Sequence, residues 1–76
     1  MEITIYAKQN CPACTATKKA MDRAGLDYEV IDVTNSPTRQ QALRKCGFRT
    51  MPVVEVVDCE DYRSWEGFRP DLIKQL

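Results

Sequence analysis

Two cysteines separated by two residues, Cys11 and Cys14, are the residues of this sequence best placed to do chemistry. They follow an alternating apolar segment at residues 1–7 and precede a segment in which small and apolar residues have helical spacing. The pair is therefore expected at the start of a helix, where backbone N–H groups without intrahelical partners carry partial positive charge. A cysteine held there is closer to its thiolate form, which is the form that attacks disulfides. The spacing thus predicts reversible disulfide chemistry, and Pro12 suits the first helical position.

The composition narrows the chemistry that the chain can perform. Its 76 residues are enough for one sheet and a few helices. Basic and acidic residues number 11 each, so no bulk charge favours nucleic acid or a membrane surface as a partner. Histidine is absent, which excludes Cys-His and Ser-His nucleophile pairs and histidine-containing metal sites.

The first residues alternate like a strand, and no apolar run has the length of a signal peptide core or a membrane span. We therefore expect a cytoplasmic protein in a reducing setting. In such a setting, cysteines are more often catalytic or metal-binding than part of structural disulfides.

The hydrophobic pattern predicts seven elements in the order βαβαββα. The predicted strands span residues 1–7, 28–33, 52–57 and 62–65, and the predicted helices span 12–24, 37–46 and 70–76. Gly25 and Gly47 end the first two helices, and Asn35-Ser36 offers an N-terminal cap for the second. Because a βαβ unit requires parallel strands, the prediction is an α/β fold with a four-stranded mixed sheet flanked by three helices. Residues 1–76 would form a single domain.

Three motifs in this element order resemble the glutaredoxin and thioredoxin superfamily. Cys11-Pro12-Ala13-Cys14 follows the first strand, and Thr50-Met51-Pro52 precedes the third. The run Trp65-Glu66-Gly67-Phe68-Arg69-Pro70-Asp71 looks like the W-x-G-F-R-P-D signature of NrdH-type redoxins, and Gly47-Phe48-Arg49 also fits them. The resemblance covers essentially the whole chain and includes the thioredoxin/glutaredoxin fold.

The resemblance implies a thiol–disulfide oxidoreductase that acts as a dithiol electron donor without a cofactor of its own. It would take electrons, ultimately from NADPH, through thioredoxin reductase and pass them to class Ib ribonucleotide reductase. Cys11 would be the attacking thiolate and Cys14 the resolving thiol. Pro52 would be a cis-proline facing the dithiol, with Thr50 and Met51 presenting backbone to an extended substrate. We expect this carrier to be a monomer.

Further candidates for partner binding come from the same three motifs and from the loop before the dithiol. They are Lys8, Pro12, Ala13, Trp65, Gly67, Phe68 and Arg69. Lys8 would add positive potential near the thiols, unless it is a solvated surface group. Trp65 and Phe68 either contact a partner or cover the sheet edge. Arg69 pairs either with Asp71 or with an acidic tail of a partner.

Two alternatives remain open at this stage, and a purely structural disulfide is a third. A proline directly after the first cysteine, as in Cys11-Pro12, is typical of glutaredoxins. The first alternative is therefore a glutathione-dependent glutaredoxin. Glu66 stands where glutaredoxins have one of two glycines, and its carboxylate should repel glutathione. The second alternative is a metal-binding module, with zinc held by all four cysteines or an iron–sulfur cluster shared between two chains.

The two remaining cysteines are expected to differ in exposure. Cys46 falls on the apolar side of its predicted helix and is interpreted as a small buried residue. Cys59 lies among carboxylates in a predicted turn, so we expect it to be exposed and a poor nucleophile. The Arg44-Lys45 pair and Arg49 are interpreted as solvated surface charge rather than as a basic patch.

Overall fold

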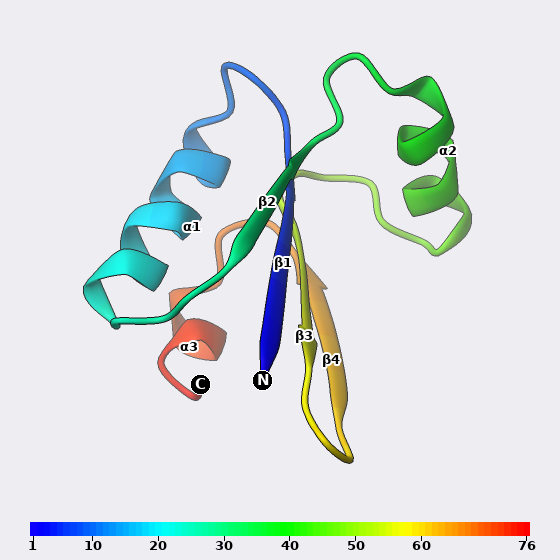
Figure 1. Cartoon of the computed structure of the whole chain (residues 1–76). Coiled ribbons are helices and arrows are strands. Elements are labelled where there is room, and N and C mark those ends of the chain that lie inside the picture. Colours follow the sequence, from blue (N-terminus) through cyan, green and yellow to red (C-terminus); the bar gives the residue numbers. More distant parts are fainter.

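A four-stranded mixed sheet in the order β2-β1-β3-β4 forms the centre of the molecule, as the computed structural model of residues 1–76 shows (Figure 1). The elements are β1 (Glu2–Ala7), α1 (Pro12–Arg23), β2 (Glu29–Asp32), α2 (Pro37–Lys45), β3 (Val53–Val57), β4 (Tyr62–Glu66) and α3 (Pro70–Ile73). β1 is parallel to β2 and antiparallel to β3, and β3 is antiparallel to β4. The predicted element order and the mixed sheet are confirmed.

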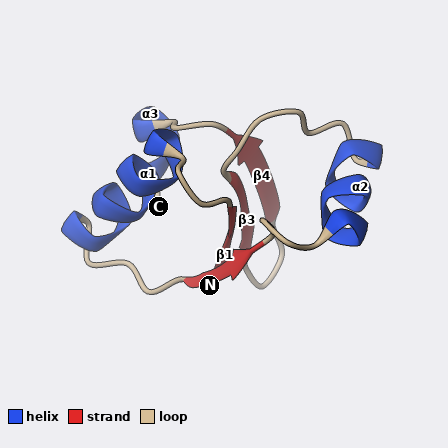
Figure 2. Ribbon diagram, turned by 90° about the horizontal axis from the view of Figure 1, so that it is seen from above, coloured by secondary structure: helices blue, strands red, loops and turns tan.

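The helices lie on both faces of the sheet, with α1 and α3 on one side and α2 on the other (Figure 2). The face under α1 and α3 holds the hydrophobic core, because alternate residues of each strand point toward it. Its buried members are Ile3, Ile5, Ala7, Cys14, Met21, Val54, Val56, Trp65 and Ile73. Burial of these apolar side chains is the main term that stabilises the fold.

Helix α1 begins at the predicted residue and ends at Arg23, one residue before the predicted end. Pro12 occupies the first helical position, and Gly25 has a φ of 70°, a left-handed conformation that glycine adopts without steric cost. Its one fully buried polar residue, Thr17, donates its hydroxyl to the Ala13 carbonyl at 2.8 Å, which satisfies the group inside the core. None of the three helices has the length and apolar character needed to span a membrane.

Helix α2 differs from its prediction because it contributes no buried residue to the core. The prediction that Cys46 is buried is wrong: its thiol is exposed. The apolar spacing is present, but Leu43 is only half-buried, and an open groove lined by Ala42, Tyr6 and Glu55 lies between the helix and the sheet. The Ser36 side chain makes no capping hydrogen bond. Gln40 instead donates its amide to the carbonyls of Val33 at 2.6 Å and Thr34 at 3.2 Å and ties the helix to the chain before it.

The C-terminal elements follow the prediction in type and order, with one-residue shifts in β3 and β4 and a larger difference in the last helix. The β3–β4 turn is closed by the Asp58 N–H donating to the Asp61 carbonyl at 2.9 Å, and Cys59 is exposed there as expected. Helix α3 was predicted to extend through Leu76 and instead ends at Ile73. So short a helix is held by tertiary contact rather than by its own hydrogen bonds, here through buried Ile73.

The sheet face under α2 carries a polar cluster of Tyr6, Glu55 and Tyr62. Tyr62 donates its hydroxyl to Glu55 Oε2 at 2.7 Å. A hydrogen bond with Glu55, helped by burial, raises the pKa of Tyr6 from 10.0 to about 12. The same carboxylate raises the pKa of Tyr62, again chiefly through its hydrogen bond.

We expect the Glu55→Gln variant to lower the pKa of Tyr6 toward its ordinary value. The fold favours the protonated phenol, so its contribution to stability is complete below pH 10 and is lost as the pH rises through about 12. Tyrosine-selective NMR titration would follow each ring separately. Tyr28, whose pKa is raised mainly by burial, serves as the internal control. An unchanged Tyr6 titration in the variant would contradict this assignment.

Candidate active site

Cys11 and Cys14 lie at the start of α1, after the loop that follows β1. They are joined by a disulfide, with 5.2 Å between their Cα atoms. Asn10 makes the turn into the helix with a φ of 55°, a left-handed conformation that asparagine tolerates better than most residues. Cys11 is the N-cap residue of α1, and its Sγ accepts the Cys14 backbone N–H at 3.1 Å. The sulfur therefore faces the free N–H groups of a helix start, an environment that favours negative charge on it once the disulfide is reduced.

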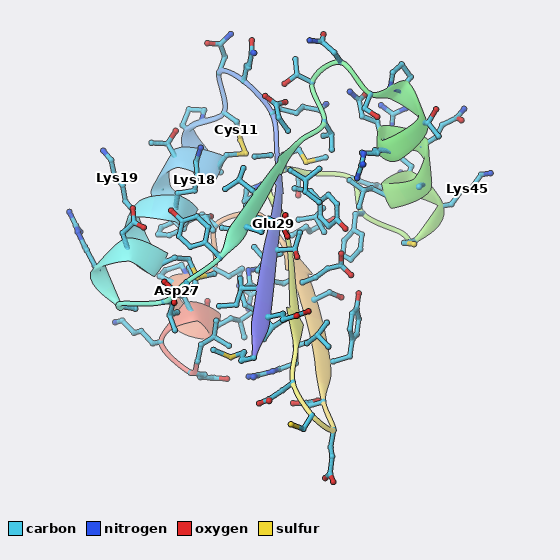
Figure 3. The ribbon with its side chains drawn as sticks, in the orientation of Figure 1. Cys11, Lys18, Lys19, Asp27, Glu29 and Lys45 are labelled. Carbon is cyan, nitrogen blue, oxygen red and sulfur yellow. A yellow bond between two sulfur atoms is a disulfide. The ribbon has the colours of Figure 1, made fainter.

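The two sulfur-bearing residues differ in accessibility. Cys11 is half-buried and faces the surface, whereas Cys14 is only 2% exposed and belongs to the core cluster. Figure 3 shows Cys11 at the end of the molecule where the β1–α1 loop lies. A bulky disulfide can therefore reach Cys11 and not Cys14. The exposure and hydrogen bonding of the pair fit an attacking thiol followed by a resolving one.

The segment before β3 lies beside the dithiol, and its Met51–Pro52 peptide bond is cis, as the resemblance implied. Thr50 and Met51 line the same groove as Cys11, while Pro52 is buried beneath them. The turn is fixed on its inner side because Gly67 donates its N–H to the Pro52 carbonyl at 2.8 Å. Gly67 has a φ of 78°, which explains glycine at this point of the C-terminal motif.

Glu66 has a structural contact that the sequence did not indicate. Its Oε2 accepts the backbone N–H of Arg49 at 2.8 Å and so ties the end of β4 to the segment that leads to Met51. Together with the Gly67 bond, this contact attaches the C-terminal motif to both sides of the cis-proline turn.

We expect the Glu66→Ala variant to increase the hydrogen exchange rate of the Arg49 amide by about fivefold, the value of one net hydrogen bond. The Glu66→Gln variant keeps an acceptor oxygen and serves as the matched control, with exchange close to that of the unmodified protein. Residue-resolved NMR exchange measures both. Equal Arg49 protection in the Ala and Gln variants would refute the role of this contact.

An open groove of about 390 Å³ runs from Cys11 between the β1–α1 loop, α2 and the segment before β3. Its apolar part is formed by Leu43, Phe48 and Met51, and its charged part by Lys8, Arg44 and Arg49. No carboxylate lines it. Cys11 and Pro12 also border a second groove on the side of β2, where Lys18 faces Asp32. Asp32 accepts the Thr34 N–H at 2.8 Å, and hydrogen bonding with Thr34 lowers its pKa.

The sequence-predicted binding residues are only partly brought together. Lys8 and Pro12 line the groove with Cys11, and Ala13 lies half-buried in the first turn of α1. Trp65 is 7% exposed and belongs to the core, so of the two interpretations the structure favours the covering role. Phe68 is exposed and lines none of the grooves beside Cys11.

Arg69 pairs within the chain. Its Nε and a terminal nitrogen donate to the two Asp71 oxygens at 3.2 and 3.0 Å. This contact lowers the pKa of Asp71 and raises that of Arg69. Of the two partners that the sequence left open for Arg69, the structure shows Asp71.

Several groove residues were missed by the sequence analysis. Leu43 and Arg44 come from α2, and Phe48 and Arg49 come from the segment after it. Their signals in the sequence are the density of arginine and lysine between residues 39 and 49, interpreted above as solvated surface charge, and the Gly47-Phe48-Arg49 motif. The two cysteines outside the dithiol, Cys46 and Cys59, are free thiols, and no group of three or more His, Cys, Asp or Glu side chains is arranged to hold a metal ion.

Comparison with known proteins agrees with this geometry. The sequence profile of the Glutaredoxin family matches residues 3–58. The glutaredoxin-like protein NrdH of Escherichia coli strain K12 is 49% identical over 76 residues, which is all of this chain and 89% of that protein. The protein of the same description from Lactococcus lactis strain IL1403 is 28% identical over 97% of both chains.

Solved structures show the same relationship. The structure of the E. coli NrdH-redoxin, a glutaredoxin-like protein described as having a thioredoxin-like activity profile, superimposes with a TM-score of 0.89 and covers 100% of this chain and 95% of its own, at 49% identity. A glutaredoxin from Archaeoglobus fulgidus superimposes with a TM-score of 0.70, at 27% identity over 99% of this chain and 84% of its own.

A dithiol at the start of α1, beside a cis-proline turn on a four-stranded mixed sheet, defines a thiol–disulfide oxidoreductase of the thioredoxin fold. Within that class, the chain belongs to the glutaredoxin family and is a glutaredoxin-like redoxin of the NrdH type.

Proposed function

We propose that this redoxin is a dithiol electron donor that reduces protein disulfides, those of class Ib ribonucleotide reductase in particular, and is itself reduced by thioredoxin reductase. The observation that carries the proposal is the Cys11–Cys14 disulfide, in which one sulfur borders an open groove and the other is buried. The name NrdH and the thioredoxin-like activity of the E. coli relative support the choice of target and reductase.

The reaction begins with the reduced form of the protein. The Cys11 thiolate attacks one sulfur of the target disulfide, forms a mixed disulfide and releases the other target sulfur as a thiolate that takes up a proton. Cys14 then loses its proton and attacks the Cys11 sulfur. The second target sulfur leaves as a thiolate, and the protein is left with the Cys11–Cys14 disulfide. The target gains two electrons and two protons, and the reductase returns them from NADPH.

The other residues of the site position the target segment or favour the reactive form of Cys11. Thr50 and Met51 present the backbone edge along which an extended target segment would lie, and Pro52 holds that edge against the dithiol. Lys8 and the start of α1 favour the thiolate over the thiol. Gly67 supports the turn from beneath. The protein would act as a monomer, as one domain and in the cytoplasm, where a reducing environment suits the free thiols of Cys46 and Cys59.

A glutathione-dependent glutaredoxin is the second candidate, favoured by the Cys11-Pro12 pair and by the match to the Glutaredoxin family. NADPH consumption separates the two when the protein is given an oxidised protein disulfide with either thioredoxin reductase or glutathione plus glutathione reductase. Turnover with thioredoxin reductase alone supports the proposed function, and turnover with glutathione alone overturns it. Turnover with neither directs attention to the iron and zinc content of anaerobically purified protein.

A further inference from the structure

The charges of this protein are balanced in number but not in position. Lys8, Arg44 and Arg49 line the groove at Cys11, and no carboxylate does. Figure 3 shows Cys11 at the start of α1 and Asp27 beyond the other end of that helix. Because the formal net charge is zero, the positive potential at the groove is matched by acidic residues elsewhere in the protein.

None of the three groove cations forms an ion pair within the protein, although Lys8 also borders the second groove, which Asp32 lines. The two ion pairs of the structure join Arg63 to Asp61 and Arg69 to Asp71, and neither involves the groove. Glu66 comes closest to an exception, because it contacts the backbone of Arg49. Its Oε2 accepts that N–H and no ion pair with the Arg49 guanidinium is formed. All three cationic side chains are exposed and available to a ligand.

The cations come from two sides of the groove. Lys8 belongs to the β1–α1 loop, and Arg44 and Arg49 belong to α2 and the segment after it. Leu43, Phe48 and Met51 add apolar side chains to the lining of the same groove. A peptide that places a disulfide on Cys11 and runs along Thr50 and Met51 therefore passes close to charges of one sign.

We propose that this groove selects target segments in which acidic residues flank the disulfide, with Arg44 and Arg49 as the specificity-determining residues and Lys8 as a third contributor. The proposal rests on the proposed function, since it names the class of substrate for the same dithiol. Cations at the rim of an interface act mainly on the rate of association, which rises when the partner carries the opposite charge. The selection is therefore expressed in the second-order rate constant and is weakened by salt.

The test uses the reduced full-length protein and three synthetic peptides with the same internal Cys-x-x-Cys disulfide. The flanking residues are aspartate, asparagine or lysine. Single-turnover reduction is stopped with acid and quantified by chromatography, so no reductase is needed. Each rate constant is divided by that of dithiothreitol with the same peptide, which removes the intrinsic effect of the flanking charges on the disulfide.

We expect the corrected rate constant for the aspartate peptide to exceed that for the asparagine peptide by about tenfold at low salt, with the lysine peptide slower still. The advantage falls as the ionic strength is raised to about 0.5 M, because screening then acts within a few ångströms. The double variant Arg44→Gln, Arg49→Gln reduces the aspartate-to-asparagine ratio to about 2. Both side chains are exposed, so the substitutions remove charge without disturbing the core.

Lys45→Gln is the matched control. Lys45 follows Arg44 on the same helix and carries the same charge, but it lines neither groove at Cys11 and points away from the body of the protein (Figure 3). Its variant keeps the ratio of the unmodified protein. A ratio near 1 in the unmodified protein, or an equal loss in the Lys45→Gln variant, would overturn the inference and leave the proposed function intact. Failure to reduce any of the three peptides would overturn the proposed function itself.

Discussion

The Cys11→Ser variant is expected to lose reduction of protein disulfides by at least about a thousandfold, because the only cysteine that lines the groove is removed. A serine hydroxyl at this place stays protonated at neutral pH and cannot form a mixed disulfide. The buried Cys14 cannot replace Cys11, since its side chain is 2% exposed and faces the core. Initial rates of NADPH consumption with thioredoxin reductase and an oxidised protein measure the loss.

The Cys14→Ser variant should fail at the next step and in a different way. Cys11 still attacks, but nothing resolves the mixed disulfide, so one equivalent of target becomes covalently attached to the protein. Intact-mass analysis without reductant would detect this adduct. The double variant Cys46→Ser, Cys59→Ser is the control and should keep normal turnover, because both thiols lie outside the groove at Cys11. Normal turnover in the Cys11→Ser variant or in the Cys14→Ser variant would contradict the mechanism.

The largest effect on stability is expected from Trp65→Ala. Trp65 is 7% exposed, stands opposite Val54 in the β3–β4 pair and belongs to the core cluster. Truncation of a buried tryptophan costs about 3–5 kcal/mol. A domain of this size has a total free energy of unfolding on the order of 5–10 kcal/mol. The urea midpoint should therefore fall by at least about 1 M.

The Trp65→Phe variant separates packing from hydrogen bonding. The indole Nε1 of Trp65 is buried and has no hydrogen-bond partner, so phenylalanine loses no hydrogen bond and keeps most of the apolar volume. We expect it to lose much less stability than the alanine variant. Because Trp65 is the only tryptophan, unfolding is followed by far-ultraviolet circular dichroism rather than by fluorescence. An alanine variant with a normal urea midpoint but weaker target reduction would instead make Trp65 a partner contact.

The fold and the dithiol were accessible from the sequence because their signals are local. Alternation identified β1, helical spacing and Gly25 identified α1, and two cysteines at the junction marked the site. The β3–β4 hairpin could also be predicted from the sequence, because a run of valines is followed by a polar turn and a second strand. In each case the deciding residues are neighbours along the chain.

The groove could not be predicted in the same way, because its walls come from segments that only the tertiary structure brings together. The failed prediction for Cys46 has the same origin. The apolar spacing of α2 is real, but spacing alone does not state how closely a helix approaches the sheet. The role of Glu66 was likewise hidden, since its partner is a backbone N–H 17 residues earlier.

The absence of buried residues from α2 has a consequence for how this redoxin can change over evolutionary time. The core cluster of nine buried residues lies on the side of the sheet away from α2, in the strands, α1 and α3. Of the α2 side chains that line the groove, Leu43 and Arg44 contribute little to that core, whereas Gln40 holds the helix to the preceding chain. If the groove binds targets as proposed, mutations at these positions can change the preferred target without lowering the stability below what folding requires. Because the core and these groove residues are separate, α2 is the element in which substitutions can alter the choice of target while the dithiol stays unchanged.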